Sequence, residues 1–361
     1  MAPRCSGNDG SALACRAVIR TAVIRSVSTG SERITEQQAT AQQAREAAQR
    51  IRGLVLETPL VYSSAFSDLT GASVYFKLEN RQTTGSFKLR GATNWLMTLT
   101  EEQRSKGCVA ASSGNHGAAV ACAMQTLGTS GVIFVPEQTS AAKVDVIGAY
   151  GGEVVFFGTD GLDTEQHARE FADRNGMVYL SPYNDERVIA GQGTCGVEIV
   201  EQLPNTDTVF VAVGGGGLIA GVGSVLKEHN PRIRIIGCQP EASAVMARSI
   251  EAGEIIELHS EPTLSDGTAG GIETGAITFP LNQLIVDDFV LVDEAQIASA
   301  MRLFMDTEGD VIEGAAGVAI ASMLELGGSI RGQNVVVIIC GGNISQEKLD
   351  QVRHIGNLKT S

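Results

Sequence analysis

The most informative stretch of the sequence is Thr83-Thr84-Gly85-Ser86-Phe87-Lys88-Leu89-Arg90-Gly91-Ala92. It places a lysine between a glycine–serine turn and an arginine–glycine pair, directly after the strand-like run 74–78, and this is one of only seven lysines in the chain. Apolar residues on both sides of Lys88 predict a half-buried amine, and burial lowers the pKa of an amine toward its neutral, nucleophilic form. Such amines form Schiff bases with carbonyl compounds. A lysine stem that merely runs along a helix start fits the same local pattern.

The composition is that of a globular protein with two lobes or domains. The chain has 361 residues, of which 43% are hydrophobic and 19% charged, which is too apolar for disorder. A net charge of -14 argues against nucleic acid or an anionic membrane surface as a partner. The longest apolar runs are of strand length, so we expect no membrane-spanning helix. Seven scattered cysteines without a CxxC pair predict free thiols in a reducing, cytoplasmic setting.

Residues 1–31 differ from the rest of the chain. They contain four arginines and one acidic residue, with many serines and alanines. This composition suits an organellar transit peptide, and an unstructured upstream extension is the alternative. In either case we expect residues 1–34 to lie outside the fold as an N-terminal extension.

Short β-rich runs alternate with helix-length, alanine-rich segments over most of the chain. Strands are expected at 74–78, 108–111, 131–135, 153–157, 178–180, 208–213, 233–238, 288–292 and 334–340. Helices are expected at 35–52, 91–99, 118–127, 140–149, 162–174, 191–202, 219–228, 294–308 and 314–326, the first with Thr35 and Gln38 as a capping box. Apolar strands in this alternation predict a mostly parallel sheet covered on both faces. Because so many strands exceed one comfortable sheet, we expect two doubly wound α/β domains that share a cleft.

Three loops follow strands, at the carboxyl edge where open α/β sheets bind ligands. The first is residues 111–117, which carry Ser112, Ser113, Asn115 and His116 before a helix. Hydroxyls, an amide and unpaired N–H groups at a helix N-terminus suit a carboxylate or a ring hydroxyl. Serine-rich turns also simply cap helices, and His116 fits a role in packing the loop.

The second loop contains four consecutive glycines, 214–217, followed by Leu218 at a helix start. Four glycines let the backbone turn tightly and point successive N–H groups at one anion. A phosphate dianion at a helix N-terminus is the natural occupant. A dinucleotide fingerprint also begins at Gly215, but that fingerprint needs an acid at the end of the next strand. The chain has Gln239 there, so we favour a single phosphate group.

The third loop is Cys340-Gly341-Gly342-Asn343, which ends the most apolar strand. A thiol at a strand tip is usually structural, and it is also able to act as a weak partner for a neutral heterocyclic nitrogen. The five histidines show no HxxxH or HxH spacing, and no GxSxG occurs. We therefore expect neither a metal site nor a serine hydrolase centre.

Together these motifs resemble those of fold-type II pyridoxal-phosphate enzymes and, within them, the serine/threonine dehydratase and serine racemase family. The resemblance rests on segments 86–92, 112–117, 214–217 and 340–343, in the order and spacing of the family. It implies a fold like that of the tryptophan synthase β subunit, with pyridoxal 5′-phosphate in the cleft between two α/β domains. Residues 35–102 and 184–361 would form the large cofactor-binding domain, residues 103–183 the small substrate-binding domain, and the assembly would be a homodimer.

The resemblance also implies a role for each matching residue. Lys88 is implied to be the Schiff-base lysine, and Ser113 the second catalytic residue. The implied cofactor-binding residues are Phe87, Lys88, Asn115, Gly214, Gly215, Gly216, Gly217, Leu218, Glu313 and Cys340. The implied substrate-binding residues are Ser112, Ser113, Gly114 and His116. In this arrangement Asn115 bonds the ring hydroxyl, the glycines hold the phosphate, and Cys340 faces the ring nitrogen.

The implied reaction is β-elimination from a hydroxy amino acid to a 2-oxo acid and ammonia, as in serine/threonine ammonia-lyases. Ser113 leaves a second activity open, because racemases of the family carry serine there as a base, whereas threonine dehydratases often carry alanine. Family members also act on 3-hydroxyaspartate or hydroxyectoine-derived substrates. Two cation-binding positions of the racemases hold Gln239 and Val245 here, so no metal is expected. A non-catalytic phosphate-binding protein remains the alternative of another class, and it leaves Lys88 without a role.

Overall fold

The computed structural model describes residues 18–20 and 30–355, with side chains from residue 35 onward. The expected N-terminal extension therefore lies largely outside the described residues. Two parts of it are described and differ from the expectation. Strand β1 (Val18–Arg20) pairs antiparallel with β10 (Asp288–Val292), where a sheet edge offers unpaired backbone groups. Helix α1 (Gly30–Arg50) begins before Thr35, so that residue lies inside the helix and does not cap it.

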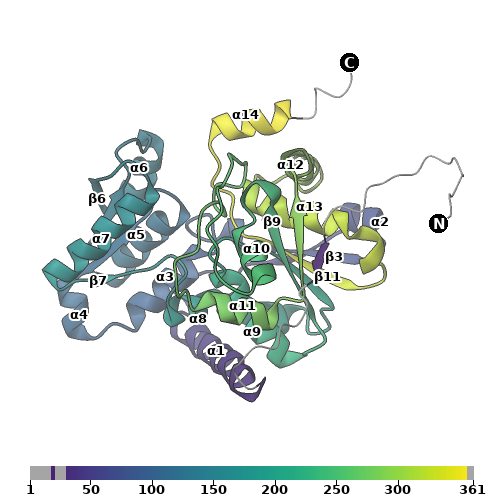
Figure 1. Cartoon of the computed structure of the whole chain (residues 1–361), viewed down its shortest axis with the longest axis horizontal. Helices are drawn as coiled ribbons and strands as arrows, with labels where there is room; N and C mark the ends of the chain where they lie inside the picture. The colour runs from purple at the N-terminus through teal and green to yellow at the C-terminus, as the bar shows by residue number, and fades with distance from the viewer. Residues whose placement is uncertain (1–17, 21–29, 356–361) are drawn as a thin grey trace, which may run out of the picture.

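The described chain forms two separate sheets (Figure 1). The larger has the order β1-β10-β9-β8-β11-β3-β2, and its central strands from β10 to β3 are all parallel. These include β3 (Ser73–Leu78), β8 (Thr208–Ala212), β9 (Arg234–Pro240) and β11 (Asn334–Ile339), with β2 (Leu60–Ser63) antiparallel at one edge. The smaller sheet is entirely parallel and has the order β6-β5-β4-β7. It contains β4 (Cys108–Ala111), β5 (Gly131–Val135), β6 (Glu153–Phe156) and β7 (Val178–Tyr179).

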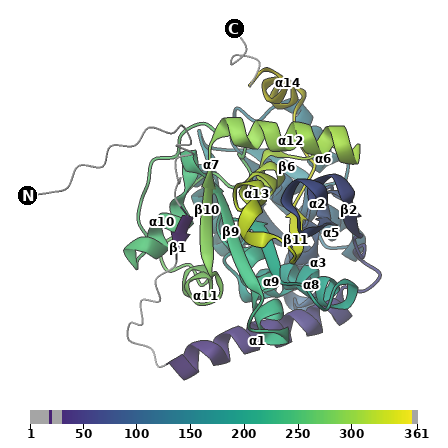
Figure 2. The ribbon, with the colours of Figure 1, turned by 90° about the vertical axis from the view of Figure 1, so that its right-hand side faces the viewer.

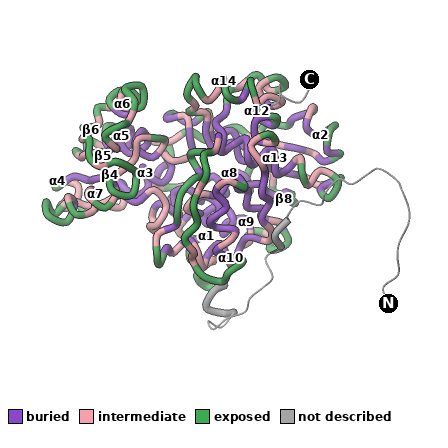
Figure 3. The backbone as a smooth tube through the Cα atoms, turned by 45° about the horizontal axis from the view of Figure 1, so that its top comes forward, coloured by how far each residue is buried: buried purple, intermediate pink, exposed green. Residues whose placement is uncertain are grey.

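Helices cover both faces of each sheet, as Figure 2 shows for the larger one. On the larger sheet, α13 (Gly314–Glu325) lies on one face beneath α12 (Glu294–Glu308), and α9 (Gly217–His229) lies on the other beneath α8 (Glu186–Gln202) and α1. On the smaller sheet, Cys108 and Ala110 pack with α5 (Asn115–Leu127), whereas Val109 packs with α7 (Gly161–Asn175). Successive strand residues point to opposite faces, so these two helices lie on opposite sides. Apolar strands buried on both faces form the core (Figure 3).

The predicted alternation of strands and helices is confirmed, and β4, β5, β10 and α12 have the expected bounds. The sequence did not predict the edge strands β1 and β2. It also did not predict several short helices: α2 (Ser64–Thr70), α4 (Glu101–Lys106), α10 (Val245–Ala252), α11 (Thr278–Ile285) and α14 (Gln346–His354). Helices of two turns show too little apolar periodicity to stand out. Among the described helices, none has the length and apolar character needed to cross a membrane.

Two helices carry the chain between the sheets. Helix α3 (Lys88–Met97) leads from β3 toward the smaller sheet, and α8 leads back to β8. The two helices touch at glycines. A Cβ atom on Gly191 would lie 2.6 Å from the Cα of Gly91 and 2.7 Å from the carbonyl oxygen of Arg90. Because these are backbone atoms, no side chain fits there, and the first turns of α3 are held directly against α8.

We predict that Gly191→Ala destabilises the protein by about 1–3 kcal/mol through overpacking of the α3–α8 contact. The matched control is Gly148→Ala, at the end of α6 (Ala141–Gly148), where an added Cβ meets nothing within 4 Å. Alanine is the better helix former, so the control should gain up to about 1 kcal/mol. Urea unfolding measures both changes. Equal effects at the two sites would contradict the proposed close contact.

Candidate active site

Lys88 is the first residue of α3, and the turn before it is paired with the loop that follows β11. The N–H of Phe87 donates to the carbonyl of Cys340 over 3.1 Å, and the N–H of Gly342 donates to the carbonyl of Gly85 over 2.9 Å. Gly85 has a left-handed φ of 72°, which glycine adopts without strain. These two bonds bring the predicted lysine and the predicted thiol together at the carboxyl end of the sheet.

The amine of Lys88 is half-buried, as the sequence predicts. Its Nζ donates to the carbonyl of Pro182 over 2.8 Å and lies 5.3 Å from the centre of the Phe87 ring. Burial lowers the pKa of Lys88 to about 8, although the charge of the nearby Glu313 acts in the opposite direction. About a tenth of such amines are neutral at pH 7, so Lys88 is able to act as a nucleophile or a base.

A cluster of polar side chains surrounds the carboxyl group of Glu313, at the start of α13. Asn115 donates to this carboxyl group over 2.8 Å, and the Sγ of Cys340 lies 3.7 Å from its other oxygen. Asn343 in turn donates to the Oδ1 of Asn115 over 2.7 Å. The structure thus brings three predicted residues together from α5, α13 and the end of β11. Asn343 belongs to the predicted loop 340–343 but was given no role from the sequence.

Burial sets the protonation of this cluster. Burial raises the pKa of Glu313 to about 7, although the hydrogen bond from Asn115 lowers it. Burial, followed by the charge of Glu313, raises the pKa of Cys340 well above its ordinary value. The thiol therefore stays protonated at physiological pH and presents a neutral group.

The loop before α5 holds the remaining predicted residues. The hydroxyl of Ser112 accepts the N–H of Gly114 over 3.2 Å. His116 is buried, and its Nε2 lies 3.0 Å from the carbonyl of Leu180, so this nitrogen carries the proton and donates it. Burial, and then the charge of Lys88, lower the pKa of His116 to about 3. His116 is therefore neutral, and the contact of its Nε2 packs the loop. Ser113 is half-buried, and its hydroxyl makes no hydrogen bond to any residue of 35–355.

The glycine loop between β8 and α9 requires its glycines. Gly216 has a left-handed φ of 85°. A Cβ on Gly215 would lie 2.4 Å from the ring of Tyr183, and one on Gly216 would lie 2.0 Å from the Nδ2 of Asn282. Within the described part of the chain, the N–H groups of residues 214–218 donate to no acceptor. Free N–H groups at the start of a helix form a site for an anion.

A family model described as "Pyridoxal-phosphate dependent enzyme" matches residues 51–341, most of the chain. The chain belongs to this family. Pyridoxal phosphate is therefore the cofactor of the protein, and the predicted fold class is confirmed. The residues described above fit the cofactor, because a reactive amine, an amide beside a neutral thiol, and a set of free N–H groups match its aldehyde, its ring and its phosphate.

Relatives of known activity cover nearly the whole chain. It is 39% identical to the L-threonine ammonia-lyase of Thermotoga maritima over 89% of this chain and 80% of that protein. It is 40% identical to the catabolic L-threonine dehydratase of Escherichia coli over 85% of this chain and 94% of that protein. Among solved structures, processed threonine deaminase isoform 2 from Solanum lycopersicum has a TM-score of 0.86 at 34% identity, covering 94% of this chain and 98% of that one. Maize serine racemase has a TM-score of 0.82 at 35% identity, covering 87% of this chain and 96% of that one.

Gln239, one of the two positions compared above with the cation-binding positions of racemases, makes structural hydrogen bonds. The side chain of Gln239 donates to the carbonyl of Val213 over 3.0 Å and accepts the N–H of Ala247 over 2.8 Å. Its amide thereby ties the end of β9 to α10. Among the residues that the structure describes, no group of three or more histidines, cysteines and acids is placed to hold a metal ion.

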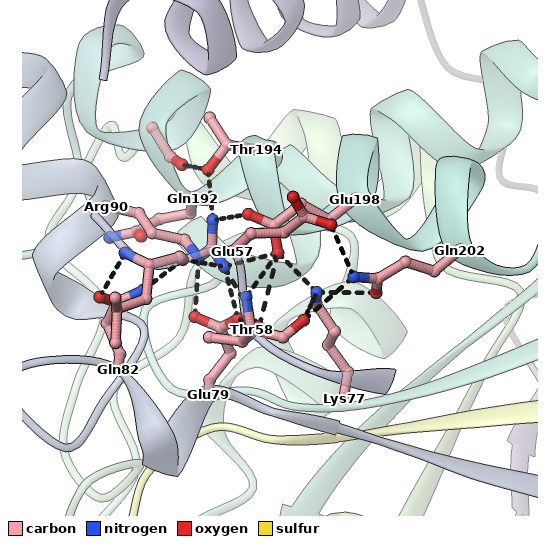
Figure 4. Close-up of polar contacts among 12 residues, drawn as sticks. Glu57, Thr58, Lys77, Glu79, Gln82, Arg90, Gln192, Thr194, Glu198 and Gln202 are labelled. Atoms are coloured by element: carbon pink, nitrogen blue, oxygen red, sulfur yellow. Dashed lines mark hydrogen bonds and ion pairs between the residues drawn. The ribbon is translucent and has the colours of Figure 1, made fainter. Parts of the chain in front are cut away.

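A buried group of charges lies two residues along α3 from Lys88 (Figure 4). The guanidinium of Arg90 forms two bonds to Glu79, of 2.7 and 2.8 Å, and two to Glu198, of 2.5 and 2.9 Å. Lys77 bonds the same carboxyl group of Glu198 at 2.5 Å. The side chains of Arg90, Glu79 and Lys77 are fully buried. Burial alone would raise the pKa of Glu79, but the charge and bonds of Arg90 lower it overall.

This charge cluster, formed by Lys77, Glu79, Arg90 and Glu198, links three elements that carry the site. Lys77 lies on β3, Glu79 lies in the turn Glu79–Arg81 that follows, and Glu198 lies on α8. Two cations face two carboxylates, so the cluster has no net charge. Bidentate arginine–carboxylate pairs fix direction as well as distance. The start of α3, and Lys88 with it, is thereby oriented against both β3 and α8.

We predict that Arg90→Met destabilises the enzyme by about 3–5 kcal/mol, because it leaves two buried carboxylates with one cation. The matched control is Arg81→Met, which breaks the ion pair with Asp310, where the arginine side chain is 52% exposed. Exposed pairs contribute at most about 1 kcal/mol. Urea unfolding compares the two variants. A small effect of Arg90→Met would contradict the role given to the charge cluster.

The lowered pKa of Lys88 gives a second prediction. Only the neutral amine is acylated, so a short pulse of acetic anhydride on the cofactor-free enzyme should label Lys88 to half its maximum near pH 8. Glu313 raises the pKa of Lys88, so Glu313→Gln should move the midpoint to lower pH. Peptide mass spectrometry over a pH series reports the labelling. A midpoint that Glu313→Gln leaves in place, or moves upward, would show that this carboxylate does not act on the amine.

Proposed function

We propose that the protein is a serine/threonine ammonia-lyase that converts a β-hydroxy amino acid, with L-threonine foremost, into a 2-oxo acid and ammonia. One observation carries the proposal: the turn that bears the half-buried amine of Lys88, with its pKa near 8, is hydrogen-bonded to the strand end that bears the neutral thiol of Cys340. The bacterial relatives at 39% and 40% identity carry this activity in their names. Their similarity over most of the chain supports the same substrate class.

Each residue contributes a defined part. Bound pyridoxal phosphate supplies an electron sink that acidifies the α-proton of an amino acid. Lys88 would hold the aldehyde end of the cofactor and, as a free amine, would take the α-proton as a base. The residues proposed to hold the cofactor are Phe87, Asn115, Glu313 and Cys340 at the ring, and Gly214, Gly215, Gly216, Gly217 and Leu218 at the phosphate.

The protonated thiol of Cys340 favours elimination. A carboxylate facing the ring nitrogen would hold a proton there and strengthen the electron sink, whereas a neutral thiol does not. A weaker sink favours prompt loss of the β-hydroxyl group over reactions such as transamination. The side chain of Cys340 thereby selects among the reactions that the cofactor permits.

The substrate carboxylate is proposed to bind at the start of α5. Ser112, Ser113, Gly114 and His116 form this loop, and the first N–H groups of the helix have no intrahelical partner. The loop belongs to the small domain, proposed as residues 103–183, while residues 35–102 and 184–361 form the large one. We further propose a cytoplasmic homodimer, which light scattering of the purified protein would test. Residues 1–31 remain a proposed extension or transit peptide.

Racemisation is the second candidate activity. The hydroxyl of Ser113 is half-buried and makes no hydrogen bond to any described residue from 35 to 355, so it is available to exchange a proton. Maize serine racemase is among the similar structures. A base on the second face of the substrate is what racemisation adds to elimination.

We predict that the enzyme releases 2-oxo acid from L-threonine and L-serine faster than it racemises L-serine. Lys88→Ala should lower the release by about 10³-fold or more, because it removes both the attachment point and the base. Ser113→Ala should retain elimination and lose racemisation. Keto-acid release and optical rotation, measured on L- and D-serine, separate the two reactions. Racemisation that outruns elimination would contradict the lyase assignment.

A further inference from the structure

Helix α11 (Thr278–Ile285) is hydrogen-bonded to the glycine loop, residues 214–217. Thr278 is its first residue and Asn282 lies four residues later, so both side chains project from the same face. The hydroxyl of Thr278 donates to the carbonyl of Gly215 over 2.7 Å, and the amide of Asn282 donates to the carbonyl of Gly216 over 3.4 Å. Both residues are fully buried. Two buried side-chain donors thus bind the carbonyl groups of consecutive loop residues, Gly215 and Gly216.

The amide of Asn282 has no structural need to make this contact. The carbonyl of Gly216 already accepts the N–H of Ala220 over 3.0 Å, inside α9. The other end of the amide, Oδ1, is buried and has no hydrogen-bond partner in the described part of the chain. A buried acceptor without a partner costs stability. An aliphatic side chain of the same size would avoid that cost, so the benefit of Asn282 must come from elsewhere.

The carbonyls of Gly215 and Gly216 determine where the next N–H groups point. A peptide unit is planar and trans, so its C=O and its N–H point in opposite directions. Fixing the two carbonyls therefore fixes the N–H groups of Gly216 and Gly217, and no described residue accepts a hydrogen bond from either. The ring of Tyr183 lies close to Gly215, and the Cβ and backbone of Tyr183 lie close to Gly217. The loop has little freedom to turn.

We propose that Thr278 and Asn282 are positioning residues that aim the N–H groups of Gly216 and Gly217 at the phosphate of the cofactor. The inference rests on the proposed role of the glycine loop as the phosphate site. It assigns to the first turns of α11 a function in cofactor affinity. Asn282 then lowers the stability of the fold through its unpaired acceptor and raises the affinity for the cofactor.

The test separates phosphate binding from binding of the rest of the cofactor. Full-length enzyme is stripped of cofactor and titrated with pyridoxal phosphate and with pyridoxal, which lacks the phosphate. Thr278→Val and Asn282→Leu should each weaken binding of pyridoxal phosphate about tenfold, the effect of losing one hydrogen bond to the loop, and leave pyridoxal binding unchanged. Thr278→Ser, which keeps the hydroxyl, should retain wild-type affinity. Gln283→Leu, on the same helix and half-buried, is the matched control.

Urea unfolding of the cofactor-free variants completes the experiment. Asn282→Leu should leave the midpoint unchanged or raise it, because the unpaired acceptor is gone. Equal loss of affinity for both ligands, or unchanged affinity for pyridoxal phosphate, would overturn the positioning role. If the wild-type enzyme itself bound pyridoxal as tightly as pyridoxal phosphate, the glycine loop would not be the phosphate site, which is a failure of the proposed function and is distinguishable from the first.

Discussion

The guanidinium of Arg90, buried between Glu79 and Glu198, is the interaction on which the arrangement of the site depends. It ties the lysine-bearing turn of α3 to the end of β3 and to α8, the helix that returns the chain from the smaller sheet. Buried ion pairs add little net stability compared with apolar packing, so their value here lies in direction. Apolar packing alone would hold α3 in place, whereas the bidentate ion pairs also fix the rotation of α3 about its axis. Because Lys88 is the first residue of α3, the direction of its side chain follows from the orientation of the helix.

Strand order places the three parts of the proposed cofactor site side by side. In the larger sheet, β11 lies between β8 and β3, although it comes last in the chain. The end of β8 carries the glycine loop, the end of β11 carries Cys340, and the segment after β3 carries Lys88. Parallel strands bring their carboxyl ends to one edge. The glycine loop, the thiol of Cys340 and the amine of Lys88 therefore meet at that edge, and Asn115 joins them from the smaller sheet through its hydrogen bond to Glu313.

The sequence predicts those parts of the site that form a recognisable pattern within a few consecutive residues. Consecutive glycines, a lysine between apolar neighbours and a thiol at a strand end are visible in short windows, and the structure brings Lys88, Asn115, Glu313 and Cys340 together. Residues that act through distant partners were not predictable. Arg90 and Glu198 are 108 positions apart, and Thr278 is 63 positions from Gly215. Such contacts depend on which helix covers which strand, and no local pattern encodes that. The pairing of Val18–Arg20 with β10 is likewise a contact between distant parts of the chain that no local pattern shows.

Chemical trapping of the cofactor would show whether the half-buried amine of Lys88 is the one that binds it. The enzyme purified with pyridoxal phosphate is reduced with borohydride, digested and mapped by mass spectrometry. A single pyridoxyl-phosphate adduct is expected, on the peptide that contains Lys88. An adduct on Lys77 or on any other lysine, or a reduced enzyme with no adduct at all, would contradict it.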